Sequence, residues 1–210
     1  MKFDFPSPEF YGWFDDFDGA MFGDWVVTAT EAGSGDASES VQDADLGVLL
    51  LTPDAADDDN VFLQSSSEIF KFVAGKRLYF GCRFKVADVT QCDFVLGLQI
   101  RDVSPLAVSD GIFFQKDDGD ALLDFHCEKD AVSSDATAIK TLADDTWYVV
   151  EFYFDGIDKV HAFVDGTEVG YTAITNAPDD EELAISAGIQ NGAAAVKTMS
   201  IDWIRVVKER

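Results

Sequence analysis

Three titratable residues on one segment are the first candidates for acid–base catalysis. In Asp124-Phe125-His126-Cys127-Glu128, the side chains of Asp124, His126 and Glu128 alternate, so in a β-strand they share one face. Two carboxylates on one face could act as acid and base on a glycosidic bond. The two acids, however, would stand roughly 13 Å apart in a regular strand, whereas glycosidase pairs are separated by roughly 5 to 9.5 Å. We therefore expect a polar outer face here and no catalytic residues.

Nucleophilic catalysis has no better candidate in this sequence. His126 and His161 are the two histidines, and no Gly-x-Ser-x-Gly motif is present. Neither histidine has a serine or cysteine nucleophile beside it in the sequence. We therefore predict that the chain is not an enzyme.

An Asp-rich segment offers hard oxygen ligands. The residues concerned are Asp54, Asp57, Asp58, Asp59 and Asn60. Carboxylate and amide oxygens suit calcium, although the spacing departs from the Asp-x-Asp-x-Asp-Gly pattern of an EF-hand loop. Aspartate-rich turns are also common in very acidic chains. No cofactor is predicted, and calcium stays open as the alternative.

Charge and composition limit the class of partner. The chain has 210 residues, 40 Asp and Glu against 15 Lys and Arg, and a formal net charge of −25. Nucleic acids and anionic membranes are disfavoured as partners, because both need a basic surface. A hydrophobic fraction of 47% and 18 phenylalanines instead predict a folded core. The odd set Cys82, Cys92 and Cys127, without a C-x-x-C pair, indicates buried thiols rather than disulfides or zinc. With no signal sequence apparent after Met1, cytoplasmic synthesis is expected.

Alternating apolar and polar residues predict β-strands from about residue 68 onward. The clearest examples are residues 78–86, 94–100, 121–127 and 148–154. Turn signals separate them, including Asp117-Asp118-Gly119-Asp120, Asp155-Gly156 and Asp165-Gly166. With no helical periodicity between the strands, the sequence predicts an all-β, antiparallel two-sheet sandwich or jelly roll.

The first 65 residues are different in character. Aromatic side chains crowd the opening segment, among them Phe3, Phe5, Phe10, Tyr11 and Trp13. They either form a strand that seals the core or belong to an N-terminal arm that docks on another subunit. We predict an arm over residues 1–12 and one sandwich domain over residues 13–210. Residues 31–45 are expected to form a long polar loop.

Cationic side chains lie mainly on two successive predicted strands. Arg77, Arg83, Lys85 and Arg101 fall on polar faces, opposite in sign to most of the chain. Cross-strand ion pairs would explain them. The alternative is that these cations and the opening aromatics form a partner-binding surface.

Several segments together resemble the concanavalin A-like lectin/glucanase superfamily, in particular its laminin-G-like jelly-roll branch. They are Asp15-Asp16-Phe17-Asp18-Gly19 with Trp25, residues 46–52, residues 76–86, residues 110–114 and residues 147–170. The resemblance covers nearly all of residues 13–207 and implies a concanavalin A-like jelly roll. Glycanases of this superfamily carry a Glu-x-Asp-x-Glu strand, from which this chain departs because His126 replaces the middle acid. In overall character the chain also resembles capsid decoration (cement) proteins of tailed bacteriophages.

From this resemblance we predict a non-enzymatic virion subunit that binds and stabilises a capsid shell. Its partners would be the major capsid protein or other virion subunits, with homo-oligomerisation, and its location the capsid surface. The alternative function is that of a lectin-like carbohydrate-binding module. A glycanase is a further alternative, which the sequence favours less. The module would use Tyr79, Tyr153, His161 and Phe163 as a stacking platform on one sheet face.

Overall fold

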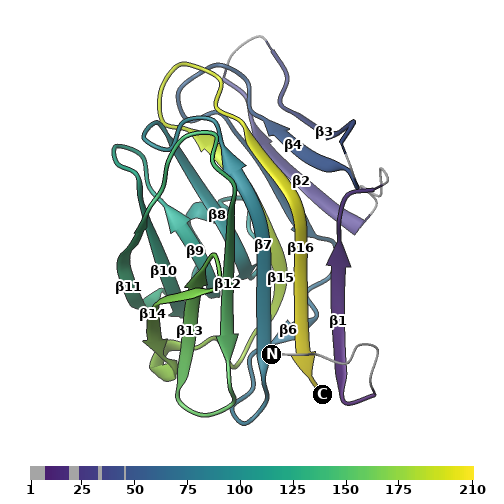
Figure 1. The fold of residues 1–210 in the computed structure, drawn as a ribbon, viewed down its shortest axis with the longest axis vertical. Coiled ribbons are helices and arrows are strands. Elements are labelled where there is room, and N and C mark those ends of the chain that lie inside the picture. Colours follow the sequence, from purple (N-terminus) through teal and green to yellow (C-terminus); the bar gives the residue numbers. More distant parts are fainter. Residues whose placement is uncertain (1–7, 19–23, 33–34, 45) are drawn as a thin grey trace.

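The computed structural model describes residues 8–18, 24–32, 35–44 and 46–210, which form two antiparallel sheets packed face to face (Figure 1). Sheet A runs in the order β14 (Thr167–Ala173), β13 (Lys159–Val164), β12 (Tyr148–Phe154), β7 (Leu78–Val86), β16 (Met199–Glu209), β4 (Val48–Thr52) and β3 (Ser38–Gln42), and β1 (Phe10–Asp15) also pairs with β16. Sheet B runs in the order β11 (Val132–Thr141), β10 (Leu122–Lys129), β9 (Gly111–Lys116), β8 (Cys92–Gln99), β15 (Glu182–Asn191), β5 (Asn60–Ser65) and β2 (Trp25–Thr30), and β6 (Phe70–Lys71) also pairs with β15. The predicted all-β antiparallel sandwich is confirmed.

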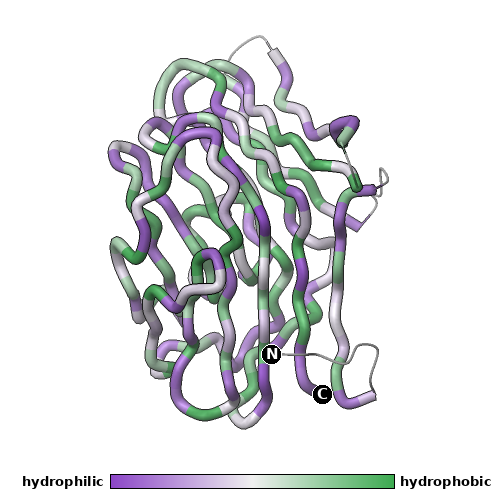
Figure 2. Tube along the Cα trace, in the orientation of Figure 1, coloured by the Kyte–Doolittle hydropathy of each residue, from purple (hydrophilic) through white to green (hydrophobic). Residues whose placement is uncertain are grey.

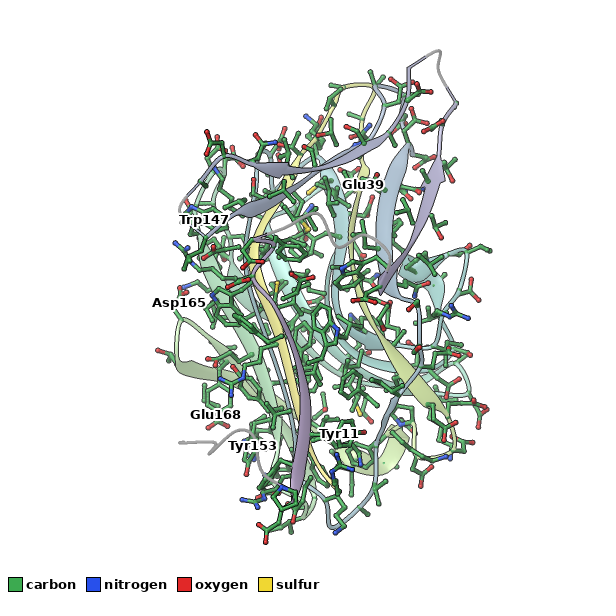
Figure 3. The ribbon with its side chains drawn as sticks, turned by 90° about the vertical axis from the view of Figure 1, so that its right-hand side faces the viewer. Tyr11, Glu39, Trp147, Tyr153, Asp165 and Glu168 are labelled. Carbon is green, nitrogen blue, oxygen red and sulfur yellow. The ribbon has the colours of Figure 1, made fainter. Side chains whose placement is uncertain are left out.

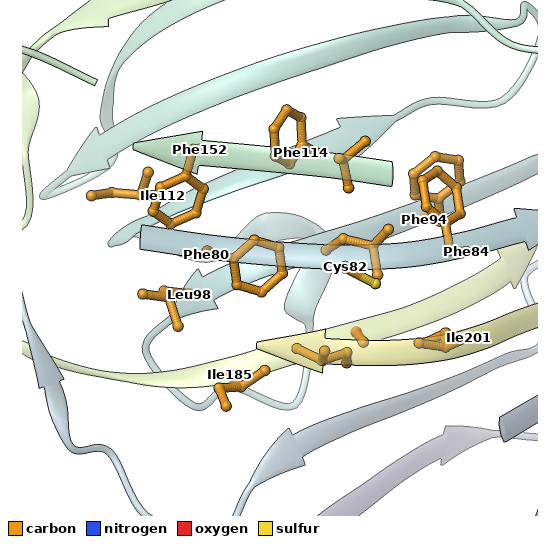
Figure 4. Close-up of a cluster of buried hydrophobic side chains, with 14 of the residues drawn as sticks. Phe80, Cys82, Phe84, Phe94, Leu98, Ile112, Phe114, Phe152, Ile185 and Ile201 are labelled. Carbon is orange, nitrogen blue, oxygen red and sulfur yellow. The ribbon is translucent and has the colours of Figure 1, made fainter. Parts of the chain in front are cut away.

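The core lies between the two sheets and follows from period-two alternation. In β7 the side chains of Leu78, Phe80, Cys82, Phe84 and Val86 point inward and are at most 2% exposed. They meet inward rings from β12 and from sheet B, as the close-up in Figure 4 shows. Figure 2 shows hydrophobic and hydrophilic residues interleaved along the strands rather than segregated into separate segments. Burial of alternate residues therefore fixes which face of each strand is free for function.

Turn chemistry sets the register of the β12–β13–β14 meander. Asp165 and Gly166 both have positive φ, 52° and 73°, as a two-residue hairpin turn requires. Gly156, between β12 and β13, has φ 94°. These turns put Tyr153 opposite His161 and His161 opposite Tyr171.

The N-terminal segment differs from the expectation. Phe10–Asp15 forms β1, and Tyr11 and Trp13 turn inward to pack against the core. Residues 10 to 12 of the expected arm are thus part of sheet A, paired with the C-terminal half of β16. The arm itself stays a prediction for residues 1–7, including Phe3 and Phe5, which lie outside the described residues. The expected polar loop at residues 31–45 is also corrected, because β3 forms within it and pairs with β4.

A second, smaller apolar cluster covers the outer face of sheet B. Phe62, Val95, Val108 and Phe113 pack together there, with Ile100 and Leu106 against them. Val108 and Leu106 come from the segment between β8 and β9, which includes the short helix η2 (Pro105–Ala107). Gly97 and Gly188 leave room for the rings, since an added Cβ would lie 2.5 Å from Phe113 and 2.3 Å from Phe62. The middle of this face is therefore filled.

Two further expectations concern the thiols and the membrane. Cys82, Cys92 and Cys127 are free and buried, as predicted. Among the described residues, no helix has the length and apolar character needed to cross a membrane.

Candidate functional site

An aromatic row crosses the outer face of sheet A. It consists of Tyr79, Tyr153, His161 and Tyr171, one from each of the neighbouring strands β7, β12, β13 and β14. These four residues are directly opposite one another in register, so the row spans about 14 Å at the usual strand spacing. All four are partly or well exposed, and Tyr171 is 51% exposed. In Figure 3, Tyr153 and Glu168 lie along one side of the molecule, and Tyr11 lies beyond β1 toward the interior.

A second row runs beside the first and adds charge. Register pairs Phe14 with Arg205, Arg205 with Gly81, Gly81 with Glu151, Glu151 with Phe163, and Phe163 with Glu168. This row therefore contains both rings and charged groups. Three of the predicted platform residues, Tyr79, Tyr153 and His161, form the aromatic row, and Phe163 lies in this second row. Tyr171, Phe14 and Arg205 were not predicted, because only the register reveals that they extend the two rows.

Hydrogen bonds hold the platform side chains in place. The hydroxyl of Tyr79 donates to Oε1 of Glu151 at 2.6 Å, and Nδ1 of His161 is 2.8 Å from Oε1 of Glu168. Burial raises the pKa of Tyr79, and the bond to Glu151 raises it further, while the charge of Arg205 opposes both. Burial also raises the pKa of Tyr153. Both hydroxyls therefore stay protonated, and able to donate hydrogen bonds, well above neutral pH.

The predicted cationic residues are mostly paired with acids. Arg77 contacts Glu209 at 3.0 Å, Arg83 contacts Asp202, and Lys85 lies 4.0 Å from Asp145. All three cations lie on or beside the outer face of sheet A. Arg101 is elsewhere, after β8, where its guanidinium donates to the carbonyl of Ser66 at 3.0 Å. The structure thus brings three of these four together, in the ion pairs that the polar-face interpretation anticipates.

Predicted partner-binding aromatics are divided between two environments. The ring of Tyr11 stacks on Phe70, with centroids 5.8 Å apart, and Trp13 packs edge-on against Trp25 at 5.1 Å. Both rings therefore contribute to internal packing. Phe10 lies on the outer side of β1, where the guanidinium of Arg77 sits 4.8 Å from its ring centroid.

The residues considered for catalysis lie on the outer face of sheet B. Asp124, His126 and Glu128 alternate along β10 with buried residues, as predicted. Nδ1 of His126 is 2.8 Å from Oδ1 of Asp135 on β11, and its ring stacks on Phe113 with centroids 5.2 Å apart. Burial raises the pKa of Glu128, the charges of Asp135 and Asp110 raise it further, and His126 lowers it. A carboxyl group with a raised pKa is the property that sequence alone could not show.

Several side-chain oxygens of the Asp-rich segment accept hydrogen bonds from within the chain. The carboxylate of Asp59 is fully buried and accepts hydrogen bonds from the amides of Ala32 and Ala56, at 2.6 and 2.9 Å. Asp58 accepts from Gln190, and Asn60 accepts from the amide of Thr30. Across the parts of the chain that the structure describes, no group of three or more His, Cys, Asp or Glu side chains is arranged to hold a metal ion.

Comparison with known proteins supports the fold. No family model and no curated protein matches the sequence. Solved structures do match: an endo-1,3-β-glucanase from Streptomyces sioyaensis has a TM-score of 0.66 and 14% identity, over 97% of this chain and 98% of that one. A glycoside hydrolase family 16 endo-glucanase from Bacteroides ovatus has a TM-score of 0.65 and 16% identity, over 92% and 99%. The Emp46p carbohydrate recognition domain has a TM-score of 0.60 and 10% identity, over 91% of each chain.

These matches correct one prediction and leave others as they were. The prediction that the chain is not an enzyme is overturned, because endo-glucanases are among the proteins with this fold. The capsid-decoration hypothesis, with its virion partners and location, stays a prediction that none of these three matches supports. What is established is the architecture: the chain has the concanavalin A-like jelly roll that these glucanases share.

Proposed function

We propose that the protein binds a polysaccharide chain across the outer face of sheet A. The observation that carries this proposal is the in-register row Tyr79, Tyr153, His161 and Tyr171 on four neighbouring strands. Exposed rings in a row offer apolar surface to the faces of successive sugars. The adjacent carboxylates of Glu151 and Glu168 can accept hydrogen bonds from sugar hydroxyls.

Support for a sugar, rather than a protein, comes from the mixture of groups on this face. Protein interfaces are depleted of charge at their centre, whereas here Arg205 and Glu151 lie between the rings of Phe14 and Phe163. The matched structures include a carbohydrate recognition domain and enzymes named for glucan hydrolysis, which agrees with a glycan ligand.

Affinity electrophoresis through gels containing soluble β-glucan, xylan, mannan, glucuronan or alginate tests this proposal. The wild-type protein is expected to be retarded by at least one polysaccharide. Tyr171→Ala should reduce the retardation about tenfold, because truncating a tyrosine that anchors a ligand costs more than about 1 kcal/mol of binding. This side chain is half exposed, so the variant should keep its fold. No retardation in any gel would contradict the proposal.

A second candidate function, glycoside hydrolysis, is favoured by Glu128. Its raised pKa suits a general acid, which must hold a proton at working pH. Asp135 lies diagonally across from it, since His126 pairs with Asp135 and Glu128 pairs with Ser133. Diagonal neighbours on adjacent strands are roughly 7–8 Å apart, within the roughly 6.5–9.5 Å that inverting glycosidases use. Glu128 would protonate the leaving oxygen and Asp135 would activate water.

Hydrolysis is tested by the release of reducing ends from the same polysaccharides. If this candidate is right, Glu128→Gln abolishes activity, and Asp124→Asn, on the same strand face but four residues away, leaves most of it. Activity should fall as pH rises through the raised pKa of Glu128, because the acid then loses its proton. A lack of wild-type hydrolysis, or equal activity in Glu128→Gln, would exclude this candidate while leaving binding by sheet A untouched.

A further inference from the structure

Arg205 lies on the outer face of sheet A, and stacking of sugars on the aromatic row gives its positive charge no role. It lies on β16, directly opposite Phe14 on β1 and Gly81 on β7. Among the described residues, no carboxylate lies within ion-pairing distance of it, although the chain carries 40 acidic residues. The neighbouring cations Arg77 and Arg83 each have an acid partner.

Arg205 is one of the residues that line a hollow of about 30 Å³. The hollow is lined by Gly12, Trp13, Phe14, Arg205, Val206 and Val207. Gly12 contributes no side chain to the lining. Phe14, which is 58% exposed, also lines the hollow. Val207 is in register with Tyr79, so the hollow is continuous with one end of the aromatic row.

We propose that this hollow binds the carboxylate of a uronic-acid residue in the polysaccharide chain that lies along the aromatic row. The inference rests on the proposed function and names its substrate class. A guanidinium matches a carboxylate with two parallel hydrogen bonds. A sugar bound on Tyr79 lies next to the hollow, and the exposed ring of Phe14 packs against its far side.

The protein's net charge of −25 does not prevent such binding. At physiological ionic strength, charges further away than about 8 Å are largely screened. The local surroundings of Arg205 are the apolar groups of the hollow and the hydroxyl of Tyr79, which is held toward Glu151. Glu151, two strands away from Arg205 across Gly81, accepts the hydrogen bond of that hydroxyl.

The test compares two ligands with the same linkage, a β-1,4-linked glucose hexamer and a β-1,4-linked glucuronic acid hexamer, by isothermal titration calorimetry. A second pair, xylan and glucuronoxylan, repeats the comparison on a different polysaccharide main chain. We expect the acidic member of a pair to bind about tenfold more tightly than the neutral one. Raising the salt concentration should reduce that preference.

Two variants assign the preference to this site. Arg205→Gln should remove the preference, so that acidic and neutral ligands bind with equal affinity, and Arg205→Lys should keep part of it. Arg101→Gln makes the same charge change away from sheet A and should alter neither affinity. Equal binding of acidic and neutral ligands, or a preference that survives in Arg205→Gln, overturns the inference while the proposed function stands. If neither member of either pair binds and no gel retards the protein, both fail together.

Discussion

Tyr79 donates a 2.6 Å hydrogen bond from its hydroxyl to Oε1 of Glu151, across the neighbouring strands β7 and β12. Burial and this bond both raise the pKa of the Tyr79 hydroxyl. Glu151→Gln removes the negative charge, so the pKa of Tyr79 should fall toward its ordinary value. A spectrophotometric titration of tyrosinate, with Tyr79→Phe to assign the signal, measures this. An unchanged alkaline titration in Glu151→Gln would show that the bond does not hold the hydroxyl in solution.

The same raised pKa has a consequence for stability. A tyrosine whose pKa is higher in the folded state contributes stability that is complete below its unfolded pKa of about 10 and is lost as pH rises through the folded value. The wild-type protein should therefore lose stability above pH 10, and Tyr79→Phe should lose less. Urea unfolding at several alkaline pH values measures the difference.

Two glycines should respond differently to the same substitution. At Gly97 an added Cβ would lie 2.5 Å from the carbonyl oxygen of Ile112 and from Cα of Phe113, which are backbone atoms that cannot move independently. At Gly81 it would meet the hydroxyl end of the Tyr79 side chain at 2.4 Å, which can shift without a movement of the backbone. We expect Gly97→Ala to lower the free energy of unfolding by about 1–3 kcal/mol and Gly81→Ala to lower it less. Urea denaturation of both variants gives the comparison, and equal losses would contradict the packing of β8 against β9.

We expect Asp59 to stabilise the fold in the absence of any bound metal ion. Its buried carboxylate satisfies the amides of Ala32 and Ala56, and Asp59→Ala leaves both without a partner. We expect a loss of roughly 1–3 kcal/mol. The melting temperature of the wild-type protein should be the same in calcium and in chelator, because a ligand that binds only the folded state must raise it. A clear rise in calcium would restore the ion-binding hypothesis for this segment.

The ion pair of Asp88 with Lys197, at 2.7 Å, should make stability depend on pH. Hydrogen bonds from Lys197 and Thr90 lower the pKa of Asp88. A lowered pKa contributes stability that is present above the unfolded value and is lost as pH falls through the folded value. Asp88→Asn should therefore cost about 0.5–1 kcal/mol at neutral pH, and the cost should shrink as pH falls below about 4 and vanish below the lowered pKa of Asp88. A cost that is constant with pH would mean that packing, not charge, holds the two residues.

The sequence predicts the strands that alternate cleanly and the turns that join them. Leu78–Val86 and Tyr148–Phe154 end where the pattern predicts, because buried residues alternate with partly exposed ones along most of each strand. Asp165-Gly166 marks its hairpin because few residues accept positive φ at both positions. Long-range pairing is different: nothing local in Phe10–Asp15 says that it pairs with the C-terminal strand β16.

The candidate site was only partly accessible from the sequence. Alternation puts Tyr79, Tyr153, His161 and Phe163 on polar faces, which suffices to suggest a platform. Which residues lie opposite one another depends on strand order and register, and these brought in Tyr171 and Arg205. The closed face of sheet B was equally hidden, since Val108 and Phe62 come from segments 46 residues apart whose meeting is set by tertiary packing.

The most direct measurement compares His161→Ala with His126→Ala in titrations with the polysaccharide that retards the wild-type protein most. The two histidines are matched: each has Nδ1 2.8 Å from a carboxylate and lies on the outer face of a sheet, His161 on sheet A and His126 on sheet B. We predict that His161→Ala weakens binding at least fivefold and that His126→Ala leaves it unchanged. Weaker binding in His126→Ala with no change in His161→Ala would contradict it and move the glycan to sheet B.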